Sequence, residues 1–497
     1  MGIDWGSFAE GFSTAIQFEN LIFIVIGGLL GTIVGMLPGL GPATAVAVLI
    51  PVTFGMEPTS ALILLGAIYY GAMYGGSRSS ILINTPGDGS AIAATFDGYP
   101  MTRKGQAGQA LTLATLASLV GGFVAMIGFV FLAQPLAQFA LKFGPAEYFF
   151  LLLFTLSAVV SLSKGNMLKG FISMFLGLLI TTIGIDSQSG VYRFTFGVPH
   201  LSEGVDFLVV IIGIYAVGEV LYNILLLKDD SYRIKEDVGS KWITKEQFKR
   251  SFWPALRQSP VGFLIGILPG AGGSIASMIS YSTEQQLSKK SDEFGKGAPE
   301  GLAAPESSNN AAAVGAFIPL LTMGIPGSGT TAVILGALIM LGLQPGPMLF
   351  QNQPEVVWTF VNSLFIGNIA LVIMNILLIG FLIKILKTPA NILYPIILLL
   401  AFIGTYTLGY STIDFFILMI FGVIGLFMKI LNIPSAPLIL AVIIGNQLEQ
   451  NFRMASVSCD SVFGMMTASP IAIFFVIITV LSVFLPMLLN RLARIKR

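Results

Sequence analysis

Two pairs of glycine- and proline-rich motifs carry the residues whose type and spacing could do chemistry. The first motif, GMLPG around Pro38, recurs as GILPG around Pro269. The second, NTPGDGS around Pro86, recurs as GIPGSGT around Pro326, in the same order and at nearly the same separation along the chain. A single motif of this kind is commonly only a packing or kink site in a membrane helix. Because both motifs recur, we interpret them as parts of an internal repeat with broken helices.

A helix that is interrupted inside a membrane can bind ions at its ends. Proline lacks an amide donor and its ring clashes with the preceding turn, so a Pro-Gly pair stops the helix and leaves end groups without partners. In lipid, such groups are tolerated only around a polar cavity or a bound ligand. The N-terminal end of a half-helix carries about half a positive charge and suits a carboxylate. Carbonyl, hydroxyl and amide oxygens at the opposite ends suit a sodium ion.

Small and neutral polar residues near these interruptions are therefore the predicted substrate- and ion-binding residues. In the first half they are Pro38, Gly39, Gly41, Thr44, Ser79, Ser80, Asn84, Thr85, Pro86 and Gly87. In the second half they are Gly270, Gly272, Ser274, Ser307, Asn309, Asn310, Thr322, Pro326, Gly327, Ser328, Gly329, Thr330 and Thr331. The four motif prolines, Pro38, Pro86, Pro269 and Pro326, are expected to meet around one hydrated pocket.

Three charged residues near the motifs have two readings each. Arg78 could pair with a substrate carboxylate, or it could extend to lipid headgroups at the membrane surface. Asp88 could bind a cation or a proton, but the equivalent residue of the second half is Ser328, which favours a turn-forming role equally. Glu306, like the nearby Glu300, could couple transport to a cation or could only cap a helix.

The composition indicates an integral membrane protein. Of 497 residues, 55% are hydrophobic and only 10% are charged, against about 25% charged in a soluble domain. Apolar stretches recur along the whole chain, and a bilayer core of about 30 Å needs about 20 apolar residues in a helix. We predict an all-α polytopic membrane protein with roughly ten to twelve membrane segments, some of them short or broken.

Basic residues predict the orientation and divide the chain. Residues 228–257 hold most of the soluble charge, and a second basic cluster ends the chain at Arg491, Arg494, Lys496 and Arg497. Both are expected on the cytoplasmic side because positive residues favour it. The sequence is thus divided into an N-terminal membrane half (1–227), a charged cytoplasmic linker (228–257) and a C-terminal membrane half (258–497).

Several chemistries are disfavoured by what the sequence contains. The net charge of +1 gives no signal for nucleic acid. The single cysteine, Cys459, cannot form an internal disulfide, and His200 is the only histidine, so no histidine-based metal or catalytic site is expected. No phosphate-binding loop or nucleophile elbow is present, so the chain is not expected to hydrolyse ATP or to be an enzyme. Apart from a coupling ion, no cofactor is predicted.

The motifs resemble those of the large membrane subunit of the tripartite tricarboxylate transporters. The similar runs are residues 31–51, 74–101, 144–148 and 191–196, followed by GILPGAGGSIAS, APESSNNAAAVGAFIPLLTMGIPGSGTTAVILGAL and LILAVIIGNQLEQN in the second half. The resemblance covers nearly the whole chain. The sequence departs from the family pattern at Arg78, where the family's arginine lies one residue earlier or is absent.

This resemblance implies a permease in the bacterial inner membrane. It implies two protein partners, a small membrane subunit and a periplasmic solute-binding protein that delivers a small carboxylate. Transport would be secondary and driven by a sodium or proton gradient, with inverted repeats and an elevator-like movement of the site against a scaffold. A passive anion channel or facilitator with the same half-helix site is the alternative, and a membrane enzyme is a more distant one.

Overall fold

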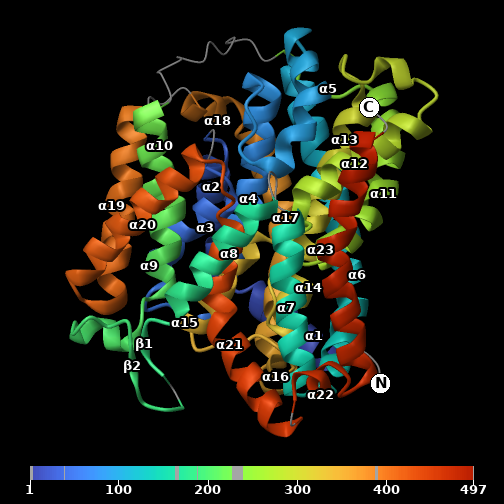
Figure 1. Ribbon diagram of the computed structural model, residues 1–497. Helices are drawn as coiled ribbons and strands as arrows, with labels where there is room; N and C mark the ends of the chain where they lie inside the picture. Colours follow the sequence, from blue (N-terminus) through green and yellow to red (C-terminus); the bar gives the residue numbers. More distant parts are fainter. Residues whose placement is uncertain are drawn as a thin grey trace.

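The computed structural model describes residues 4–37, 40–162, 167–186, 188–226, 239–386, 390–459 and 461–495. Over these residues the chain forms a bundle of helices that mostly run along one direction (Figure 1). The described strands are β1 (Gly184–Ile185) and β2 (Tyr192–Arg193), which pair antiparallel with Ile185 opposite Tyr192. The prediction of an all-α polytopic membrane protein is confirmed.

Long apolar helices form the membrane part. Within the described residues, five helical runs are long and apolar enough to cross a bilayer. They are α2 (Phe18–Gly35), α6 (Ala107–Ala140), the continuous run Phe207–Leu225, α17 (Pro354–Leu377) and α20 (Ile413–Ile430). The run Phe207–Leu225 consists of α9 (Phe207–Ile212), the π-helical turn η4 (Gly213–Val217) and α10 (Gly218–Leu226).

The first repeat contains two interrupted helices. Its α4 stops at Asn84, which adopts the left-handed conformation (φ 56°), and Pro86 follows. Proline at the first turn starts α3 and α4, where its missing amide costs nothing. The elements are α1 (Trp5–Ala15), α2, α3 (Pro42–Leu49), η1 (Ile50–Thr53), α4 (Pro58–Ile83), η2 (Gly89–Ala91), α5 (Ile92–Arg103) and α6.

The second repeat is interrupted at the equivalent positions. Here Gly324 takes the left-handed conformation (φ 72°) that Asn84 has in the first repeat. The elements are α11 (Lys245–Ile267), α12 (Gly272–Leu287), η5 (Ser291–Glu293), α13 (Pro299–Gly315), α14 (Phe317–Met323), α15 (Gly329–Met340), α16 (Pro347–Asn352), α17 and α18 (Ile379–Leu386). Residues 245–257 of the predicted linker thus form the beginning of α11.

Backbone contacts between helices show that the two repeats are packed alike. A Cβ atom built on Gly35 of α2 would lie 2.3 Å from the carbonyl oxygen of Ala72 on α4. A Cβ atom on Gly266 of α11 would lie 2.3 Å from the carbonyl oxygen of Ala312 on α13. These residues occupy matching positions of the repeat, and only glycine allows two helix backbones to approach so closely.

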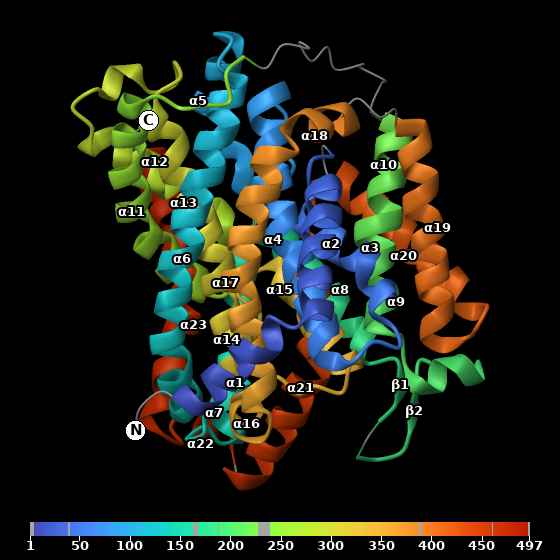
Figure 2. The ribbon, with the colours of Figure 1, turned by 180° about the vertical axis from the view of Figure 1, so that it is seen from behind.

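The two repeats enter the bundle from opposite ends. Near the start of α6, the Gln109 side chain donates a hydrogen bond to the carbonyl oxygen of Trp242, just before α11. Near the other end of α6, the Gln134 side chain accepts one from the amide of Asp4, just before α1 and α2. Figure 2 shows α1 and the start of α11 at these two ends. The repeats are therefore inverted, as predicted.

Further helices surround the repeats. The last long helix of each repeat packs on the other repeat, α6 on α13 and α17 on α4. The remaining elements are α7 (Pro145–Leu162), α8 (Met167–Thr181), η3 (Pro199–Glu203), α19 (Ala390–Gly409), α21 (Ala436–Ser458), α22 (Val462–Met466) and α23 (Pro470–Ile495). Of these, α7 and α8 pack on α21, and α23 packs on α7.

Candidate functional site

The interrupted segments of the two repeats meet around one cavity of about 620 Å³. This volume lies within the range of roughly 300–1,000 Å³ that small-molecule sites occupy. One wall consists of the broken segments before α3, α5, α12 and α15, together with Tyr69 and Met73 of α4. The opposite wall consists of η4, α10, α20 and the start of α21. Residues from all four motif regions line this cavity. Of the four motif prolines, Pro326 lines it, Pro86 and Pro269 lie outside its lining, and Pro38 lies outside the described residues.

Helices of both repeats begin at the cavity. The first residues of α3, α12 and α15, namely Pro42, Gly272 and Gly329, all line it. Each helix N-terminus presents free amides and about half a positive charge. Because these ends converge from inverted repeats, their partial charges add at the cavity, which favours an anionic ligand.

Close packing holds the broken segments against one another. A Cβ atom on Gly41 would lie 2.9 Å from the Cβ atom of Asp88, so the segment before α3 leans directly on the segment before α5. In the second repeat the corresponding residues are Gly272 (φ 55°) and Ser328. A Cβ atom on Gly272 would lie 3.8 Å from the Cβ atom of Ser328. Gly41 is required because of this close approach, and Gly272 is required because of its left-handed backbone conformation.

Two charged residues of the opposite wall were missed by the sequence analysis. Lys429 of α20 and Glu219 of α10 both line the cavity and form an ion pair. The Lys429 ammonium group also lies 4.5 Å from the centre of the Tyr222 ring, a cation–π contact. The available signal was that each is an isolated ionisable residue within a long apolar run, which marks a functional position in a membrane helix. A carboxylate ligand can compete with Glu219 for Lys429.

Asp88 lies at the cavity in a turn. Its Oδ1 atom accepts hydrogen bonds from the Ser90 amide at 3.2 Å and from the Ser90 hydroxyl at 2.7 Å. These hydrogen bonds are the ones expected of an aspartate that forms a turn. Asp88 also lines the cavity, so its carboxylate lies within reach of a ligand. Ser328 caps α15 in the same way by accepting from the amide of Thr331 at 3.2 Å.

Arg78 is held away from the cavity. Its guanidinium group donates to the side-chain oxygen and to the carbonyl oxygen of Asn375 on α17, both at 2.8 Å. The residue is only 3% exposed, so it does not extend to the surface of the chain. In this structure its contacts therefore join the two repeats rather than reach the cavity.

The predicted site residues fall into three groups. Those that line the cavity are Gly41, Thr44, Gly87, Asp88, Gly270, Gly272, Ser274, Pro326, Ser328, Gly329 and Thr330. Those placed outside its lining are Arg78, Ser79, Ser80, Asn84, Thr85, Pro86, Glu306, Ser307, Asn309, Asn310, Thr322, Gly327 and Thr331. Pro38 and Gly39 lie outside the described residues.

Hydroxyl groups near the motifs often donate hydrogen bonds to carbonyl oxygens of their own helix, which explains why some of these residues do not line the cavity. Ser79 donates to the carbonyl oxygen of Gly76 at 3.0 Å, and Thr322 donates to that of Ile318 at 2.7 Å. Such a bond to the preceding turn is available to any serine or threonine in a helix. Sequence proximity to a broken segment therefore does not decide whether a hydroxyl group faces the cavity.

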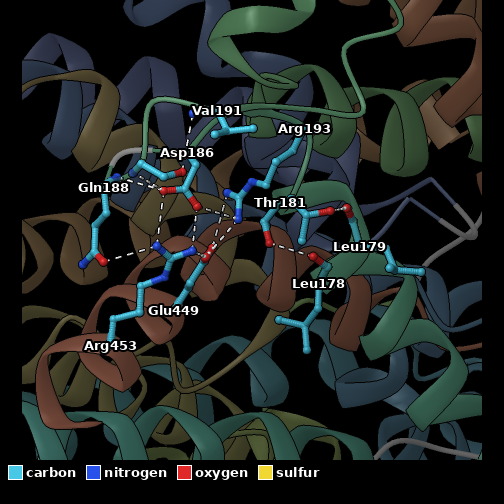
Figure 3. A network of polar contacts seen from close by, with 11 residues as sticks. Leu178, Leu179, Thr181, Asp186, Gln188, Val191, Arg193, Glu449 and Arg453 are labelled. Carbon is cyan, nitrogen blue, oxygen red and sulfur yellow. Dashed lines mark hydrogen bonds and ion pairs between the residues drawn. The ribbon is translucent and has the colours of Figure 1, made fainter. Parts of the chain in front are cut away.

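A cluster of ion pairs fixes the end of the bundle near β1 and β2. Asp186, beside β1, pairs with Arg453 at 2.6 Å and with Arg193 at 3.2 Å, and both arginines also contact Glu449 of α21 (Figure 3). Hydrogen bonding to Arg453 holds the pKa of Asp186 well below its usual range. Because α21 also contributes to the cavity wall, this cluster ties the wall to the hairpin.

Taken together, the fold and the cavity define a polytopic membrane protein built from two inverted repeats with a cavity at their broken helices. The chain belongs to the tripartite tricarboxylate transporter TctA family, whose model matches residues 21–440. It is thus a transporter-family protein of the large-subunit type, and the predicted resemblance is confirmed.

Two relatives come from Agrobacterium vitis. One, described as an uncharacterized 52.8 kDa protein in the TAR-I ttuC' 3' region, is 43% identical over 467 residues, covering 93% of this chain and 92% of the relative. The other, described as an uncharacterized protein in the TAR-II ttuC' 3' region, is 42% identical over 211 residues, covering 42% of this chain and 87% of the relative. No solved structure matches the chain.

Proposed function

We propose that this chain is the permease subunit of a three-part uptake system for a small carboxylate. In this proposal it works in the bacterial inner membrane with a small membrane subunit and a periplasmic binding protein that delivers the substrate. A sodium or proton gradient drives the transport. The observation that carries the proposal is the convergence of the N-termini of α3, α12 and α15 on one cavity that also contains Lys429.

The charge distribution of the cavity supports a carboxylate as substrate. A carboxylate brought into a membrane loses most of its hydration, so it needs oriented donors and positive charge in exchange. The helix N-termini provide the donors, and Lys429 provides a full charge. Glu219 pairs with Lys429, so the ammonium group at the cavity is not left uncompensated.

The arrangement of the walls supports alternating access. The broken segments belong to the inverted repeats, whereas the opposite wall belongs to α10, α20, α21 and the π-helical turn η4. A site between two differently built units can be opened to either side by moving one unit against the other, as inverted repeats allow. The π-helical turn is also a feature that occurs often at functional sites.

Uptake into proteoliposomes tests the proposal. The chain would be reconstituted with its small subunit and binding protein, and labelled citrate and succinate would be offered with an imposed sodium gradient or an imposed pH gradient. Accumulation above the external concentration in response to either gradient is expected. Equilibration without accumulation, accompanied by ionic conductance, would favour the passive channel instead. Absence of any flux for carboxylates to which the binding protein binds would refute the proposal.

A further inference from the structure

A buried carboxyl group lies where the two inverted repeats meet, outside the cavity lining. Glu306 of α13 is 1% exposed. Its Oε2 atom accepts hydrogen bonds from the hydroxyl groups of Ser77 on α4 at 2.6 Å and Ser118 on α6 at 3.4 Å. Its Oε1 atom is also buried but has no hydrogen-bond partner among the described residues. A buried carboxylate oxygen without a donor is costly, so one half of this group is left for a ligand.

A continuous series of hydrogen bonds joins Glu306 to the cavity wall. Ser118 accepts from the side-chain amide of Asn310 at 2.8 Å, and that amide also donates to the side-chain oxygen of Asn309 at 2.7 Å. The side-chain amide of Asn309 donates to the carbonyl oxygen of Ser90 at 3.3 Å. Ser90 lines the cavity and donates to Asp88. A change in the protonation of Glu306 can therefore affect the cavity wall through this series of hydrogen bonds.

We propose that Glu306 binds and releases the proton that couples uptake, which rests on the function proposed above. The proton comes from water and forms an O–H bond on Oε1, and on release it returns to water as the carboxylate re-forms. Oε2 keeps both hydroxyl hydrogen bonds in either state, because a carboxylic acid's second oxygen is still an acceptor. The neutral form removes a buried charge from the interior of the unit that carries the broken segments, which lowers the cost of moving that unit against the opposite wall.

The hydrogen-bond network around Glu306 lacks a donor. The side-chain oxygen of Asn310 is a second buried acceptor without a donor in the same network. Protonation turns Oε1 into a donor, which is the group that this network lacks.

The charged and titratable groups around Glu306 are few. On α4, Tyr74 lies one turn before Ser77 and Arg78 directly follows it, and Asp88 lies at the cavity end of the series. The helix α6 carries no ionisable residue. Carboxylates of the neighbouring elements are already paired elsewhere. They are Glu284 with Arg257, Glu300 with Arg250, and Asp97 with Tyr281 and the amides of Gly297 and Ala298.

Glu306→Gln separates coupling from substrate handling. Glutamine resembles the neutral acid, so substrate exchange between labelled and unlabelled pools should continue within about twofold, because this exchange needs no net proton movement. Accumulation driven by about one pH unit should fall about tenfold to simple equilibration, because one proton per substrate can support no more than that ratio. Both are measured with labelled citrate in the reconstituted three-part system, with the membrane potential clamped to zero.

Glu300→Gln is the matched control. It removes a carboxylate from the same helix, α13, while its partner Arg250 keeps Glu293 at 2.6 Å. This control should retain accumulation. If Glu306→Gln does not fold, the double variant Ser77→Ala, Ser118→Ala keeps the carboxyl group and should shift the pH dependence of exchange upward, because two donors to the charged form are lost.

The outcomes are distinct. The proton site would be overturned if Glu306→Gln accumulated substrate under a pH gradient as strongly as the wild type. It would also be overturned if a folded Glu306→Gln variant lost substrate exchange. A wild type that accumulates citrate only under a sodium gradient would overturn it as well, although the proposed transport function would then stand. A wild type that moves no carboxylate at all would instead overturn the function itself.

Discussion

Replacing Lys429 tests whether the ion pair in the cavity serves the substrate. A hydrogen bond to a charged group contributes about 1.5–3 kcal/mol, and about 1.4 kcal/mol changes a dissociation constant tenfold. Because the Lys429 side chain is 35% exposed, solvent screening places the effect at the low end of this range. We therefore expect Lys429→Gln to raise the concentration of half-maximal exchange about tenfold.

Replacing Glu219, the partner of Lys429, should not raise the concentration of half-maximal exchange. Glu219 pairs with Lys429, so a carboxylate substrate has to compete with it. Glu219→Gln removes this competition and one negative charge from the cavity wall. We expect half-maximal exchange at the wild-type concentration or below it. A pair that only stabilised the fold would give losses of similar size for both variants, because each would leave the other charge buried alone.

The assay is counterflow of labelled citrate in proteoliposomes, which reports binding by the permease under saturating internal substrate. Lys169→Gln is the control, because Lys169 also contacts the α20 end, at the carbonyl oxygen of Leu431, but does not line the cavity. This control should leave half-saturation unchanged. Wild-type half-saturation in Lys429→Gln, or an equal loss of affinity in both Lys429→Gln and Glu219→Gln, would refute the reasoning.

Two further predictions concern packing and pH. Gly266→Val should destabilise the folded protein by about 3 kcal/mol or more, because its Cβ atom would lie 2.3 Å from the carbonyl oxygen of Ala312 on α13. Thermal unfolding in detergent measures this loss of stability. An unchanged unfolding midpoint would contradict the prediction. The lowered pKa of Asp186 contributes stability that is fully present above about pH 4 and is lost as the pH falls further. Asp186→Asn should remove that part of the acid sensitivity, seen by comparing unfolding midpoints between about pH 7 and about pH 3.

Much of the architecture followed from local chemistry. The Pro-Gly pairs near Pro86 and Pro269 break helices because of what proline and glycine do to any backbone, so the sequence located the interruptions. The recurrence of both motifs also predicted the repeat, and the contacts of Gly35 and Gly266 confirm it at equivalent positions. Apolar length and low charge were sufficient to predict helices that cross a membrane.

The identity of the cavity wall depended on contacts between distant segments. Lys429 and Glu219 come from different parts of the chain, and no local pattern brings them together with the broken segments. Asn309 and Asn310 were predicted as ligands, but the structure places them in a buried network behind the wall.

What the sequence by itself determined was where helices stop, because that depends on single residues and their neighbours. What only the tertiary structure decided was which freed or polar groups face the cavity and which satisfy one another. Helix rotation and packing set that choice, and a hydroxyl or amide group bonds to whichever partner the packing brings within reach.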